Sequence, residues 1–140
     1  MLQGIDPLLS GETLRHLDAM GHSDAVVVAD AHFPARRLAA RLVDLPGIAS
    51  PRVLSALGTV LPLDDIPALD LMASPDRGQL AVQDELLEAA GVTADAARFL
   101  ERQEFYDAAR DAYLIVRTGE TRSYGNALLR KGIVTSAGGS

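Results

Sequence analysis

Four short sequence blocks place polar side chains at the ends of apolar segments, where glycine or proline interrupts the chain: 20–24 (MGHSD), 29–35 (ADAHFPA), 104–106 (EFY), and 118–120 (TGE) followed by 124–126 (YGN). Side chains at such ends can face a ligand rather than a core. Histidine titrates near neutral pH and suits proton transfer. Aspartate, tyrosine and asparagine can bond the hydroxyl groups of a small polar ligand. The blocks therefore indicate acid–base chemistry on such a ligand.

Two residues in these blocks have structural as well as functional interpretations. His22 follows a predicted helix, where it can stabilise the helix carboxyl end or act as a general acid. Asp30 follows an apolar run, where it can form a turn or bind a ligand at the edge of a sheet. The sequence alone leaves both alternatives open.

Metal and nucleophilic chemistry are poorly supported by the histidines of the chain. The pair formed by Asp30 and His32 supplies too few ligands, and the only other histidines are His16 and His22. The run 22–24 (HSD) has the residue types of a serine hydrolase triad, but adjacent residues cannot form that proton relay. The glycines at 119 and 125 lack the spacing of a phosphate-binding loop. We therefore expect neither a metal nor a cofactor.

The composition limits the class of partner. The chain has 140 residues, 48% of them hydrophobic, which suits one domain with a substantial core. A net charge of −6 argues against binding to nucleic acid or to an anionic membrane surface. The chain contains no cysteine, and it lacks a signal-like start and an apolar run long enough to cross a bilayer. We expect a cytoplasmic protein, with a single domain over 1–134 and a flexible tail over 135–140.

Hydrophobic periodicity predicts alternating helices and strands. Helices are expected from Ser10 to a glycine cap at Gly21, from Pro34 through Leu42, from an N-cap at Ser50, and over 82–90. Buried strands are expected over 25–29, 69–73, 113–116 and 127–129. The residues from 93 to 112 are rich in Ala, Glu and Arg, so they favour one long helix. This order predicts a layered α/β/α domain with a mostly parallel central sheet.

In content, order and spacing, the four blocks resemble the fucose mutarotase branch of the sugar mutarotase family that includes ribose pyranase. The resemblance extends from about residue 1 to about residue 134. The ribose branch carries histidine where this chain has Arg102, and it lacks the pair His32 and Phe33. Both differences favour the fucose branch. The resemblance also implies a short strand near 98–102, followed by a helix from about Glu104, in place of one long helix.

The resemblance assigns roles to particular residues. It implies that His22 is the proton donor and that Asp30 is a sugar-binding carboxylate. Arg102 corresponds to the arginine that the fucose branch uses on its substrate. Tyr124, Gly125 and Asn126 correspond to the carboxyl-terminal binding segment of the family. Tyr124 is also a candidate for the second proton transfer.

The family implies an isomerase that interconverts the α and β anomers of L-fucose, or of a related reducing sugar, by opening and closing the sugar ring. It also implies subunits assembled into rings, commonly decamers, with each site completed by a neighbouring subunit. Two alternatives remain open: a D-ribose pyranase, which exchanges pyranose and furanose forms, and a sugar-binding protein without catalytic activity. A phosphate- or nucleotide-binding domain is disfavoured, because residues 30–34 (DAHFP) stand where a glycine-rich loop would be needed.

Overall fold

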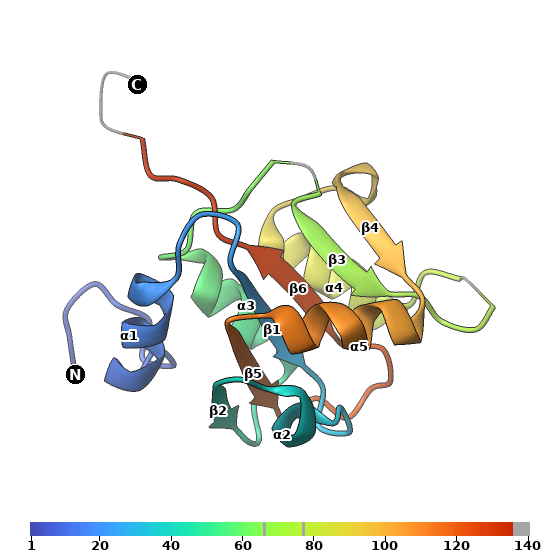
Figure 1. Cartoon of the computed structure of the whole chain (residues 1–140), viewed down its shortest axis with the longest axis horizontal. Coiled ribbons are helices and arrows are strands. Elements are labelled where there is room, and N and C mark those ends of the chain that lie inside the picture. The colour runs from blue at the N-terminus through green and yellow to red at the C-terminus, as the bar shows by residue number, and fades with distance from the viewer. Residues whose placement is uncertain (66, 77, 136–140) are drawn as a thin grey trace.

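The computed structural model describes residues 1–65, 67–76 and 78–135, and these residues contain a six-stranded sheet (Figure 1). The order of the strands across the sheet is β2-β5-β1-β6-β3-β4. Their bounds are β1 Ala25–Ala29, β2 Leu42–Leu45, β3 Leu69–Met72, β4 Ala97–Leu100, β5 Leu114–Thr118 and β6 Ala127–Arg130. Of the predicted flexible tail, residues 136–140 lie outside the described residues.

The strands run in one direction except for β6. The pairs β1–β5, β2–β5 and β3–β4 are parallel, whereas β6 is antiparallel to both β1 and β3. The prediction of a mostly parallel sheet is therefore confirmed. Because β6 is reversed, its first residue lies at the same edge of the sheet as the carboxyl end of β1, where Val28 faces Ala127.

Helices cover both faces of the sheet, which confirms the predicted layered architecture. In Figure 1, α5 (Arg102–Asp111) crosses the near face and α3 (Ser50–Gly58) and α4 (Ala81–Ala90) lie behind the sheet. One apolar cluster joins the sheet to α1 (Gly11–Ala19), α3 and α4, and a second joins it to α2 (Ala35–Leu38) and α5. A short 3₁₀ helix, η1 (Ala94–Ala96), precedes β4.

The predicted strand over 25–29 is confirmed, and its composition explains its central place. Val26, Val27 and Val28 are each 0% exposed, because helices cover both faces of β1. Val26 and Val28 belong to one apolar cluster and Val27 belongs to the other, as the two-residue repeat of a strand requires. The strand ends at Ala29, and the buried, charged Asp30 follows it directly.

Three details of the predicted helices are wrong. Helix α1 has the expected N-cap at Ser10, but it ends at Met20 with extended backbone, so Gly21 does not cap it. Helix α2 covers only Ala35–Leu38, and Leu42 instead opens β2, which pairs with β5 at the edge of the sheet. Helix α3 has Ala49 rather than Ser50 as its N-cap. The predicted stop of α4 is confirmed, because Gly91 adopts the left-handed conformation there.

The long helix expected over 93–112 from composition alone is wrong. The chain forms β4 over Ala97–Leu100 and then α5 from Arg102, as the family resemblance implies. Strand β4 completes the sheet beside β3, and its Arg98 donates two hydrogen bonds of 3.0 Å to the fully buried Asp70 of β3. This pairing outweighs the weak strand propensity of the segment.

Candidate functional site

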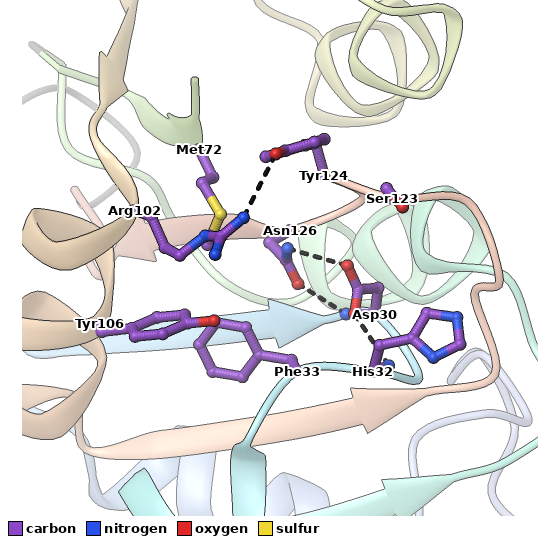
Figure 2. A pocket seen from close by; sticks show the side chains of 9 residues that line it. All are labelled: Asp30, His32, Phe33, Met72, Arg102, Tyr106, Ser123, Tyr124 and Asn126. Atoms are coloured by element: carbon purple, nitrogen blue, oxygen red, sulfur yellow. Dashed lines mark hydrogen bonds between the residues drawn. The ribbon is translucent and has the colours of Figure 1, made fainter. Parts of the chain in front are cut away.

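A pocket of about 140 Å³ lies at the edge of the sheet where β1 and β3 end and β6 begins. Figure 2 shows side chains from the end of β1, the end of β3, the first turns of α5 and the β5–β6 connection turned toward one cavity. The lining residues are Asp30, His32, Phe33, Met72, Arg102, Tyr106, Ser123, Tyr124 and Asn126. Segments far apart in the sequence therefore meet at the edge predicted to hold a ligand.

Asp30 and Asn126 form a buried, reciprocally hydrogen-bonded pair at the base of this pocket. The Asn126 amide nitrogen donates to Asp30 Oδ2 at 3.0 Å, and the Asp30 backbone N–H donates to Asn126 Oδ1 at 2.7 Å. The two residues are only 5% and 2% exposed. These bonds fix the orientation of the Asn126 amide, so each side chain presents its remaining hydrogen-bonding positions in a defined direction.

The environment of Asp30 changes its acidity. Burial raises the pKa of Asp30 above its ordinary value of 3.8. Hydrogen bonds from the His32 backbone N–H, at 2.9 Å to Oδ1, and from Asn126 oppose this change, because they favour the charged form. The carboxylate therefore takes up a proton at a higher pH than an exposed aspartate does.

Arg102 and Tyr124 lie on the opposite side of the pocket from His32 (Figure 2). Arg102 is the first residue of α5, and its Nη2 lies 3.5 Å from the Tyr124 hydroxyl. Tyr124 has a φ of 64°, a backbone conformation that is uncommon for a residue with a side chain. The loop before β6 therefore adopts a strained conformation at the residue that carries its hydroxyl into the pocket.

Five further residues line the pocket without having been predicted as site residues: His32, Phe33, Met72, Tyr106 and Ser123. Phe33 and Tyr106 stack edge to face with ring centroids 5.4 Å apart, so Tyr106 both packs against Phe33 and borders the cavity. Met72 is the last residue of β3 and is 4% exposed. The blocks 29–35 and 104–106 already contained Phe33 and Tyr106, whereas no sequence signal distinguished Met72 or Ser123.

His22 lies at the other end of β1 from the pocket. It precedes the strand, whereas Asp30 follows it, and a five-residue strand spans roughly 17 Å. The His22 side chain is 59% exposed, and its Nε2 lies 3.0 Å from Asp64 Oδ1. Within one chain, the structure thus brings together Asp30, Arg102, Tyr124 and Asn126, but not His22.

Gly125 lies beside the pocket rather than in its lining. A Cβ atom at this position would lie 2.7 Å from Cγ of Glu120 and 3.2 Å from Ser50 Oγ. Only glycine fits so close to these atoms. Gly125 therefore packs against Glu120 and Ser50 behind the pocket.

Residues 1–65, 67–76 and 78–135 contain no group of three or more His, Asp or Glu side chains that could hold a metal ion. The same part of the chain contains no helix long and apolar enough to cross a membrane.

Known proteins are similar to this chain over nearly its whole length. Residues 3–134 match the RbsD / FucU transport protein family. An L-fucose mutarotase of Glaesserella parasuis is 39% identical, covering 95% of this chain and 96% of the relative, and one of Haemophilus influenzae is 38% identical, covering 95% and 97%. The crystal structure of a fucose mutarotase from Streptococcus pneumoniae in complex with L-fucose has a TM-score of 0.87 and 31% identity, covering 96% of this chain and 100% of that one.

The match to the family extends over nearly the whole chain, including the pocket and the segment that carries His22. Relatives well above 30% identity cover nearly all of it as well. The chain therefore belongs to the RbsD/FucU family.

Proposed function

We propose that this protein is an L-fucose mutarotase, an isomerase that interconverts the α and β anomers of the sugar. The observation that carries the proposal is the buried pair of Asp30 and Asn126 at the base of a pocket that also contains Arg102 and Tyr124. The relatives named L-fucose mutarotase support it, at 36–39% identity over 95% of the chain.

The pocket has the mixed lining that a deoxy sugar needs. Asp30 offers acceptors, Arg102 offers donors, and Asn126 offers both to the hydroxyl groups of the ring. Phe33 and Tyr106, which pack edge to face, and Met72 supply apolar lining suited to the C–H faces of a sugar and to the methyl group of a 6-deoxyhexose. A monosaccharide can thus satisfy both parts of the lining at once.

Anomer exchange requires two proton movements. The ring oxygen must gain a proton and the anomeric hydroxyl must lose one, so that the hemiacetal opens and can close on its other face. Protonated His22 is the proposed donor to the ring oxygen, and the Tyr124 hydroxyl accepts or orients the proton of the anomeric hydroxyl. No group is transferred and nothing is oxidised, so the reaction as proposed uses neither a metal nor a redox cofactor.

Because His22 lies at the other end of β1 from the pocket of its own chain, we propose that it acts in the pocket of a neighbouring subunit. In a head-to-tail contact between two chains, a side chain beyond the opposite end of β1 in one chain can reach the pocket of the other. Repeating such a contact closes a ring when the rotation allows it, in agreement with the ring, commonly a decamer, that the family resemblance implies. The decamer, the sharing of the site and the cytoplasmic location stay predictions.

Saturation-transfer NMR on several reducing sugars tests the proposed activity. Saturating the anomeric proton of one form should reduce the signal of the other form when enzyme is added, because exchange moves magnetisation between them. The enzyme should accelerate this exchange for L-fucose far more than for D-ribose. Acceleration with ribose alone would instead indicate the pyranase. Tight binding without any accelerated exchange would indicate a non-catalytic binding protein.

The raised pKa of Asp30 predicts how L-fucose binding depends on pH. The ionised carboxylate accepts hydrogen bonds from sugar hydroxyls, and protonation removes that capacity on one oxygen. Affinity should therefore fall as the pH is lowered, and the fall should begin at a higher pH than an ordinary aspartate would give. Calorimetric titration at a series of pH values measures this, with circular dichroism at each pH to verify the fold. Constant affinity down to about pH 3.9 would contradict the role of Asp30.

A further inference from the structure

Glu120 is a buried carboxylate just behind the pocket, and neither the reaction nor the sugar contacts use it. It is 3% exposed and does not line the cavity. Arg122 donates to it from Nε at 3.0 Å, from Nη2 at 3.0 Å and from its backbone N–H at 3.1 Å. Ser50 donates from its backbone N–H at 3.3 Å and from its hydroxyl at 3.4 Å. The carboxylate therefore ties the β5–β6 connection to the amino end of α3.

Backbone contacts of Glu120 join the same connection to the segment that carries Asp30. The Ala31 N–H donates to the Glu120 carbonyl at 2.8 Å. The hydroxyl of Thr118 donates to the Ala29 carbonyl at 2.8 Å and accepts from the Glu120 N–H at 3.1 Å. The end of β1 and the β5–β6 connection are thus held together on both sides of Asp30.

Arg122 extends this network to a further helix. Besides Glu120, its guanidinium bonds both carboxylate oxygens of Glu85 on α4. Arg122 therefore links Glu120 to α4, while Ser50 links it to α3. The connection before β6 is therefore bonded to two helices, to α3 through Glu120 and to α4 through Arg122.

This network directly supports the strained part of the pocket. Gly125 packs against the Glu120 side chain, at a distance that leaves no room for a Cβ atom. The preceding residue, Tyr124, has the positive φ that turns its hydroxyl toward Arg102. Such a conformation persists only where the surroundings hold it in place, and Glu120 lies against its carboxyl side.

We propose that Glu120 is a positioning residue of the sugar site, which fixes the backbone of Tyr124 and Asn126 in the conformation that binds the sugar. The inference rests on the proposed mutarotase function. The ion pair with Arg122 also lowers the pKa of Glu120, so the carboxylate stays charged throughout the neutral range. The ionised Glu120 stabilises the fold fully at pH values above the ordinary glutamate pKa of 4.5. This stabilisation is lost as the pH falls through the lowered pKa of Glu120.

The test compares Glu120→Gln with a matched buried carboxylate, Asp70→Asn. Asp70 is 0% exposed and bonds Arg98 and Arg130, but it lies outside the pocket. Both substitutions keep the side-chain size and remove one buried charge, so both should lower the unfolding temperature. Only Glu120→Gln should weaken L-fucose binding, by at least about tenfold, because a displaced loop misplaces Tyr124 and Asn126.

Crystal structures of the two variants supply a readout that does not depend on the reaction. In Glu120→Gln we expect Tyr124 to leave its positive φ, and in Asp70→Asn we expect it to keep it. Wild-type affinity and an unchanged Tyr124 backbone in Glu120→Gln would overturn the inference, as would equal losses of affinity in the two variants.

If Glu120→Gln does not fold, Glu85→Gln is the alternative variant. It removes the half-exposed ion pair between Glu85 and Arg122 and should also weaken L-fucose binding. Unchanged affinity in Glu85→Gln would again overturn the inference. If the wild-type protein neither binds L-fucose nor accelerates its anomer exchange, the proposed function would be contradicted instead. The crystal structures would then still decide the role of Glu120.

Discussion

Replacing His22 with alanine should abolish accelerated anomer exchange while leaving the fold and the assembly intact. The His22 side chain is 59% exposed and its hydrogen-bonding partner is Asp64, so removing it does not disturb the packing of the core. A general acid contributes roughly 10²–10⁴-fold to a reaction rate, and we expect a loss of this size in L-fucose exchange. Saturation-transfer NMR measures the rate, and size-exclusion chromatography with circular dichroism verifies the assembly and the fold.

His16→Ala is the matched control for this substitution. His16 lies on α1, where it contacts Tyr113 and Glu12, and it does not line the pocket. Its removal should leave the exchange rate unchanged. A folded His22→Ala protein with the wild-type rate would remove His22 from the mechanism.

Local sequence patterns predict the elements that position Asp30. The β-branched run over 25–29 forms β1 because it can be buried on both faces, and the first charged residue after it stands at the ligand edge. Gly91 ends α4 as expected, since it adopts the left-handed conformation that glycine tolerates. These features depend on neighbouring residues, and neighbouring residues are what a sequence pattern describes.

Other elements depend on contacts between distant segments. Strand β4 forms from a segment with helical composition because it completes the sheet beside β3, where Arg98 neutralises the buried Asp70. Strand β2 forms from the end of a predicted helix because it pairs with β5. A local pattern contains no information on such partners, so both segments are assigned wrongly from composition alone.

The candidate site divides in the same way. Asp30 and Asn126, 96 residues apart, meet because β6 is antiparallel and begins where β1 ends. The family resemblance named both residues, but the strand order that joins them is seen only in the fold. Met72 carried no signal in the sequence, and Glu120 stood in the block 118–120 without a role assigned to it, because the importance of both comes from packing against other segments.

Mixing two inactive variants tests directly whether one chain supplies the pocket and another supplies His22. The two variants His22→Ala and Tyr124→Phe should each be inactive alone, since each removes one partner of the proposed proton transfers. In rings assembled from equal amounts of both, a site is intact when His22 comes from a Tyr124→Phe chain and Tyr124 comes from a His22→Ala chain. Random mixing makes about a quarter of the sites intact.

The measurement is L-fucose anomer exchange by saturation-transfer NMR after the two variants are unfolded together and reassembled, with mixing verified by native mass spectrometry. Each variant reassembled alone is the control. Mixed rings should recover about a quarter of the wild-type activity. Verified mixed rings without activity would contradict this prediction, because His22 and Tyr124 would then have to come from the same chain.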